Sequence, residues 1–171
     1  MIRKYLRLII AGILFLGSIF LFVEGMVSLG IWSLLVSGLF ILFHFKNIMN
    51  LLAFYFVRKN KFEKAANILG RVKHPERMIK GQEAYHYYLS GLIESQKQNN
   101  SKADKAFKKA LKIGLRVKTD QAVAKLNLSG IALAQRNKTL ARHYLTEAKK
   151  LDKQKHLSAQ VREIEAMMKR M

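Results

Sequence analysis

Between Gly91 and Ala110 the sequence reads GLIESQKQNNSKADKAFKKA, and a related pattern lies 38 residues away on either side. The neighbouring copies read AFYFVRKNKFEKAANILGRV from Ala53 and SGIALAQRNKTLARHYLTEA from Ser129. Each copy starts with a small residue, passes through a polar turn and continues with apolar residues at equal offsets. A repeat of this length is typical of stacked helix pairs, because one pair cannot bury its apolar face alone. The aligned positions are Ala53, Gly91 and Ser129; Ala65, Ala103 and Ala141; Leu69, Phe107 and Leu145; and Val72, Ala110 and Ala148.

The composition around these positions favours helix, since Ala, Leu, Lys, Gln and Glu dominate and no alternating strand pattern occurs. We expect Ser101 and Thr139 to cap the second helices of two pairs. The apolar stripe from Leu157 to Met168 predicts a terminal helix that caps the last pair. The expected helices cover about 46–59, 61–73, 77–97, 101–114, 118–136, 139–152 and 156–170.

The N-terminal quarter of the chain is almost purely apolar. Glu24 is the one charged residue between Leu8 and Phe45, and a single helix of that length would be far longer than the hydrocarbon core of a bilayer. We therefore predict two transmembrane spans, about 6–23 and 26–45, that form a hairpin turning at Glu24. The predicted domains are this hairpin, 1–45, and a helical repeat domain, 46–171.

Basic residues at both ends of the hairpin predict its orientation. Arg3, Lys4 and Arg7 begin the first span, Lys46 follows the second, and the connecting turn has no Lys or Arg. Such residues stay on the cytoplasmic side, so both termini and the repeat domain are expected there, in an integral membrane protein of a bacterial inner membrane. A cleaved signal peptide is the competing interpretation, but no small-x-small cleavage site followed by polar sequence occurs. One span with a re-entrant segment is a further alternative.

Small residues suggest how the two helices of the hairpin pack. Gly30, Ser33 and Ser37 lie on the second span, and Ser33 and Ser37 are spaced so that they share a face. Small residues allow helix backbones to approach closely within lipid. We predict these three residues at the hairpin interface, although Gly and Ser are also common in membrane helices.

The order of small residue, turn, Ala, large apolar residue and Ala resembles the tetratricopeptide repeat (TPR). In that family the small residue of the first helix corresponds here to Gly91 and Ser129, and the first Ala of the second helix to Ala65, Ala103 and Ala141. The resemblance covers roughly residues 48–152, with a period of 38 residues rather than the usual 34 and with Ser90 departing from the pattern. It implies an all-α fold, with an α-solenoid of about three helix pairs after the transmembrane hairpin and a C-terminal capping helix.

The resemblance also implies a recognition groove, because the first helices of TPR pairs face inward. The family's groove positions fall on Tyr85, Tyr88, Leu92, Gln96, Val123, Leu126, Gly130 and Leu133. These positions lack the Lys and Asn residues of family members that bind chaperone tails. An apolar or helical peptide is therefore the expected ligand. Packing between helices is the alternative role for the tyrosines.

The repeat region is strongly basic. The chain has a net charge of +20, and residues 46–171 contain 28 of its 31 Lys and Arg residues. Solvated helix surface accounts for many of these, while anionic lipid head groups or an acidic protein partner would be attracted to clustered ones. Nucleic acid is not an expected partner, because charge alone supports it and no reading motif is present. The candidate basic face consists of Lys102, Lys105, Lys108, Lys109, Lys112, Lys149 and Lys150.

The sequence contains no motif that indicates catalytic chemistry. There is no cysteine, which excludes disulfides and thiolate metal sites. The chain has five histidines but no HExxH pattern, and no phosphate-binding glycine loop or nucleophile elbow. We therefore predict no catalytic, cofactor-binding or metal-binding residues.

Two functions follow from this organisation. The first is a non-enzymatic, membrane-anchored scaffold or adaptor that recruits a protein partner through its helical repeats. The second is a small subunit or assembly factor of a larger integral-membrane complex, which binds through the hairpin itself. A membrane tether for nucleic acid is a third hypothesis, and it requires binding with a steep salt dependence.

Overall fold

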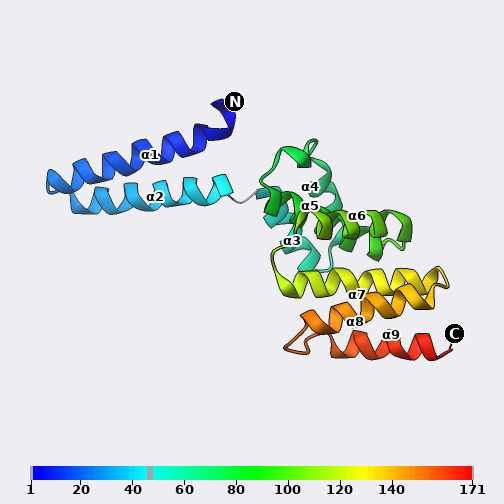
Figure 1. The fold of residues 1–171 in the computed structure, drawn as a ribbon. Helices are drawn as coiled ribbons and strands as arrows, with labels where there is room; N and C mark the ends of the chain where they lie inside the picture. Colours follow the sequence, from blue (N-terminus) through cyan, green and yellow to red (C-terminus); the bar gives the residue numbers. More distant parts are fainter. Residues whose placement is uncertain (1, 46–47, 171) are drawn as a thin grey trace. The chain divides into compact units, whose positions relative to one another are not determined.

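Two long apolar helices, α1 (Ile2–Val23) and α2 (Val27–Phe45), lie side by side and form the N-terminal unit (Figure 1). The structure is a computed structural model that describes residues 2–45 and 48–170, with side chains described for 9–41 and 48–170. The helices join in a tight turn at Gly25, whose φ of 77° is a backbone conformation that suits glycine. The turn therefore lies where the sequence predicts it.

Two serines of α2, the buried Ser37 and the half-buried Ser33, form hydrogen bonds to α1. Ser37 Oγ donates to the Ala11 carbonyl at 2.8 Å, and Ser33 Oγ donates to the Leu14 carbonyl at 2.9 Å. A Cβ added at Gly30 would lie 3.1 Å from the Phe22 ring, so the helices approach closely there. The three residues predicted at the hairpin interface thus lie between α1 and α2.

The remaining surface of the hairpin consists largely of exposed apolar side chains, including Leu16 at 67% and Trp32 at 65% of full exposure. A helix that crosses a membrane needs about 20 predominantly apolar residues. In the part of the chain that the structure describes, no helix is long and apolar enough to do so. The two predicted spans, 6–23 and 26–45, are therefore not supported. The side chains of Arg3, Lys4 and Arg7, and the whole of Lys46, lie outside the described residues.

The second unit, Met49–Met171, is built of consecutive helix pairs. Among the described residues the chain forms nine α-helices and one 3-10 turn, so the prediction of an all-helical chain of paired helices is confirmed. The predicted domain boundary, between residues 45 and 46, adjoins residues 46–47, which lie outside the described part. The unit begins with α3 (Ile48–Arg58) and α4 (Phe62–Gly70), continues with the pairs α5 (Lys80–Gln96) with α6 (Asn100–Ile113) and α7 (Lys118–Ala134) with α8 (Lys138–Leu151), and ends with α9 (Ser158–Arg170).

The turns that follow α3, α5 and α7 have the same backbone geometry. Asn60, Gln98 and Arg136, which are 38 residues apart, have φ values of 55°, 57° and 58°. The residue after each of them donates its N–H to a carbonyl five residues earlier at 2.9 Å, which ends the first helix in a Schellman-type motif. The period seen in the sequence is therefore also a period of the backbone.

The helix starts differ from the predicted ones. Asn99 and Asn137 are the N-caps of α6 and α8, and their side chains accept from the N–H groups of Lys102 and Leu140. Ser101 was expected to cap α6 and Thr139 to cap α8, but both lie inside the first helical turn. An asparagine two positions earlier supplies the side-chain oxygen that accepts the capping hydrogen bond. Pro75–Arg77 forms the 3-10 turn, and α5 begins only at Lys80.

The small residues of the repeat lie where paired helices are closest. Gly91 on α5 faces Phe107 on α6, and a Cβ added at Gly91 would come within 2.6 Å of that ring. Ser129 takes the equivalent place on α7, where it is fully buried and its Oγ donates to the Ala141 carbonyl at 2.8 Å. In the first pair Val72 departs from the pattern, because α4 ends at Gly70.

The contact between Gly91 and Phe107 gives a direct test of this packing. We expect Gly91→Ala to reduce the free energy of unfolding by about 1–3 kcal/mol, because the added methyl overpacks a filled core. The loss should be smaller in a Phe107→Leu background, where space is available. Hydrogen exchange of the α5 and α6 amides measures both effects.

Gly70→Ala is the matched control, since nothing lies within 4 Å of a Cβ at that helix end. Its effect should stay within about 0.5 kcal/mol. Equal protection in the Gly91→Ala protein and the parent would contradict the proposed packing.

Candidate functional site

The residues predicted to line an inner groove are largely core residues. Tyr88, Leu126 and Leu133 are only 4–6% exposed, and the Tyr88 ring packs against Phe107 with centroids 6.4 Å apart. Leu92 and Val123 are half-buried against the same core, and Gln96 is exposed. Helix packing, the alternative role considered for the tyrosines, therefore describes Tyr88.

The terminal helix α9 covers part of the predicted groove. It packs against α7 and, to a lesser extent, α8. Leu126 and Leu133 share a buried cluster with Val161 and Met168 of α9. A Cβ at Gly130 would lie 3.4 Å from Ile164 Cδ1. Leu126 and Gly130 also line a cavity of about 360 Å³ between α7 and α9, so α9 covers these predicted groove residues only in part.

A half-buried carboxylate lies beside the tyrosines at the start of α7. Asp120 accepts a hydrogen bond from the Tyr88 hydroxyl, and burial raises the pKa of Asp120 above its usual value. Burial and the charge of Asp120 raise the pKa of Tyr85 to about 12, so this phenol stays protonated at neutral pH. Tyr85 packs against Phe54 of α3 with centroids 6.0 Å apart. The cluster joins α3, α5 and α7, and its polar groups interact with one another.

A buried polar network connects α3 with α5. Asn50 is 1% exposed, and its Nδ2 donates to the Gln82 carbonyl at 2.9 Å. Its Oδ1 lies 3.3 Å from His86 Nδ1, and because this oxygen only accepts, His86 must carry its proton on Nδ1. Burial, together with the charge of Lys109, lowers the pKa of His86. His86 is therefore a neutral structural residue at physiological pH.

The described residues form no group of three or more His, Asp or Glu side chains able to hold a metal ion. His143 pairs with Glu147 at 3.6 Å, and His74 pairs with Glu76 at 3.0 Å. Both histidines are exposed and neither has a further carboxylate partner in the described part of the chain. Glu147 also binds Lys125 Nζ at 2.9 Å, and neither histidine pair has the further ligands that a metal site needs.

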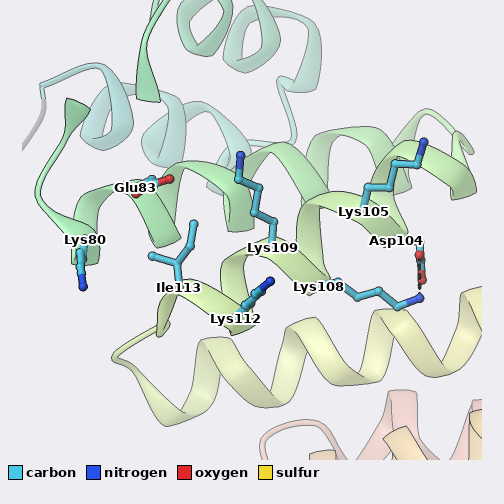
Figure 2. A pocket seen from close by; sticks show the side chains of 8 residues that line it. All are labelled: Lys80, Glu83, Asp104, Lys105, Lys108, Lys109, Lys112 and Ile113. Carbon is cyan, nitrogen blue, oxygen red and sulfur yellow. Dashed lines mark hydrogen bonds and ion pairs between the residues drawn. The ribbon is translucent and has the colours of Figure 1, made fainter. Parts of the chain in front are cut away.

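The most distinctive surface feature is a cleft of about 710 Å³ between α5 and α6 (Figure 2). Its volume is within the range of ligand-binding pockets, and lysines dominate its wall. We call it the lysine cleft. It is lined by Lys80 and Glu83 of α5 and by Asp104, Lys105, Lys108, Lys109, Lys112 and Ile113 of α6.

Two of these lysines are already engaged. Lys108 Nζ lies 2.8 Å from Asp104, one turn earlier on α6. Lys109 Nζ donates to the Tyr87 hydroxyl at 2.7 Å and lies 4.0 Å from the centre of that ring, so it bridges α6 and α5. Lys80 and Lys105, like Lys112, are exposed and have no ion pair among the described residues.

The predicted basic face is therefore divided. Lys105, Lys108, Lys109 and Lys112 lie in the lysine cleft, while Lys102 is exposed on the first turn of α6. Lys149 forms an ion pair with Glu165 of α9, and Lys150 is exposed on α8. Sequence reasoning missed Lys80 and Glu83, because they come from another helix more than 20 residues earlier and only the folding of α5 onto α6 brings them together.

Comparisons of the chain with family models, curated proteins and solved structures found no match.

The buried state of His86 predicts a pH dependence. The pKa of His86 is lowered on folding, so its contribution to stability is complete above the unfolded value of about 6.5 and is lost as pH falls below that value toward the folded pKa. We expect the free energy of unfolding to fall by up to about 1.4 kcal/mol per pH unit in that window. Thermal unfolding of the full chain at pH 7.5 and 5.5 measures the change.

His86→Gln should reduce this pH dependence, because glutamine can donate to Asn50 and does not titrate. His156→Gln, at an exposed position, serves as the control and should retain it. If both variants keep the parental pH profile, His86 is not the group that titrates.

Proposed function

We propose that this chain is a non-enzymatic, membrane-anchored scaffold that recruits a protein partner through its helical repeats. The observation that carries the proposal is the contrast between its two units. The hairpin exposes large apolar side chains such as Leu16 and Trp32, while the repeat unit has a lysine-rich surface. One part suits an apolar environment and the other suits an acidic partner.

The exposed surface of the hairpin supports attachment to lipid. Contiguous apolar surface on this scale is rare on water-exposed proteins and marks contact with a membrane or another protein. The serine hydroxyls are satisfied by α1 carbonyls, so the described part of the hairpin presents mainly apolar groups outward. We propose that the hairpin is embedded in the apolar region of a bacterial inner membrane, with both termini on the cytoplasmic side as the basic flanks indicate.

The repeated turn geometry supports a TPR-like α-solenoid as the finer description of the second unit. Three turns of the same form, at Asn60, Gln98 and Arg136, recur at 38-residue intervals. Small residues, Gly91 among them, allow the close contact between paired helices that this family uses. Proteins built this way serve mainly as binding platforms. No set of residues in the described part of the chain indicates a catalytic reaction.

The second candidate function is a small subunit or assembly factor of a larger membrane complex. The exposed Ile13, Leu16 and Trp32 favour it, since apolar helices of another protein could cover them as well as lipid does. In this case the hairpin would be the binding surface and the lysine cleft would be secondary.

The anchoring proposal predicts that the full chain floats with phosphatidylcholine vesicles and resists extraction at alkaline pH. Ile13→Lys, Leu16→Lys and Phe20→Lys, introduced together at exposed hairpin positions, should release it, since each charge opposes burial in lipid. Ser101→Lys, Thr119→Lys and Thr139→Lys add the same charge at exposed repeat positions and should leave flotation unchanged. Equal release by both triple variants would contradict anchoring through the hairpin.

Site-specific photo-crosslinking in native membranes separates the two functions. A crosslinker at Lys105 should capture the recruited protein if the scaffold proposal holds, whereas capture from Trp32 alone would favour the subunit. Lys150, exposed on α8, is the control position and should give no specific product.

A further inference from the structure

We propose that the lysine cleft binds an acidic amphipathic helix of the partner protein. This inference rests on the proposed scaffold function and names the site and the chemistry of the partner. It begins from an imbalance of charge, because five lysines and two carboxylates line one cleft. Lys80, Lys105 and Lys112 have no ion pair among the described residues.

The spacing of the lysines suits a helical ligand. Lys105, Lys109 and Lys112 occupy positions i, i+4 and i+7 of α6, so they project from one helix face. Glutamate residues at a similar spacing on a partner helix would meet them in register. Figure 2 shows the Lys105, Lys109 and Lys112 side chains along α6, with Lys80 and Glu83 on the neighbouring helix α5.

The cleft also offers apolar contact. Ile113 forms part of its wall, and the Tyr87 ring holds the Lys109 ammonium group at 4.0 Å. The methylene stems of the lysines add further apolar surface beneath their charged ends. A helix with acidic residues on one side and apolar residues next to them matches both kinds of surface.

Two features disfavour the other anionic ligands. Glu83 lies in the same cleft and has no ion pair among the described residues, so it would repel the closely spaced phosphates of a nucleic acid. The lysines line a recess between two helices, whereas a bilayer presents a broad surface to a protein. An acidic helix, with its carboxylates spaced apart, can place apolar or neutral groups next to Glu83 and Asp104.

The test uses the full chain in nanodiscs of phosphatidylcholine and a fluorescein-labelled peptide. The peptide has about 20 residues, enough to form a helix, with Glu at i, i+4 and i+7 and Leu on the adjoining face. A second peptide of the same composition has its Glu residues spread around the helix. Fluorescence anisotropy should show binding of the first peptide at least about tenfold tighter than binding of the second.

Charge reversal locates the site. Lys105→Glu with Lys112→Glu should weaken binding of the first peptide by about tenfold or more. Lys150→Glu with Lys153→Glu changes the net charge equally at exposed positions outside the cleft, and it should weaken binding by less than about twofold because those charges are screened. Lys105→Arg with Lys112→Arg should retain binding.

Three outcomes would overturn the inference. The first is an equal loss of binding in both charge-reversed proteins, and the second is equal affinity for the two peptides. The third is tighter binding of phosphatidylserine vesicles or of a single-stranded oligonucleotide that depends on Lys105 and Lys112, which would assign the cleft to lipid or nucleic acid.

The scaffold proposal can be judged separately on the same protein. If the chain floats with vesicles and gives a crosslinked partner from Lys105 but does not bind the peptide, the acidic helix is wrong and the scaffold stands. If the chain is released from vesicles while the peptide still binds, the anchoring is wrong and the cleft assignment stands.

Discussion

Close contact within each helix pair is the constraint on which the repeat unit depends. Phe107 fills the space beside Gly91, and no side chain larger than hydrogen fits between that glycine and the ring without displacement. Ser129 is tolerated at the equivalent place because its hydroxyl finds the Ala141 carbonyl, which removes the cost of burying a polar atom. The left-handed residue in each turn returns the chain at the angle that such contact requires. Packing and turn geometry thus support each other, and both recur with the 38-residue period of the sequence.

Polar groups then connect one pair to the next. Asn50 reaches from α3 to Gln82 and His86 of α5, and Asp120 reaches from α7 to Tyr88 of α5. Each link is buried or half-buried and joins groups whose hydrogen bonds require defined positions, so it fixes the alignment of adjacent pairs more narrowly than apolar packing does. The helix α5 participates in both links and also forms one wall of the lysine cleft. The position of Lys80 and Glu83 relative to α6 therefore depends on the same core that aligns the stack.

The sequence predicted much of the helical architecture because spacing between residues carries that information. Equal offsets between Ala65, Ala103 and Ala141 are visible without any coordinates, and all three residues are fully buried. Caps were less predictable, since Asn99 and Ser101 offer similar side-chain oxygens and only the backbone decides between them. Leu126 and Leu133 pack against α9, and which residues of α7 this helix covers depends on tertiary contacts that the spacing within α7 does not encode. The sequence showed only the α6 part of the lysine cleft, because the lysines of α6 recur at helical spacing. The α5 part could not be predicted, since it depends on how α5 packs against α6.

The covering of α7 by α9 also limits how the protein can assemble. In an open helical array the last pair presents an apolar side on which the first helix of another molecule could stack. Here Val161 and Met168 already fill that side, and the Lys149–Glu165 ion pair fastens the same helix to α8. A second molecule that stacked on this side of α7 would first have to displace α9, so the apolar residues of the last pair pack within the chain itself.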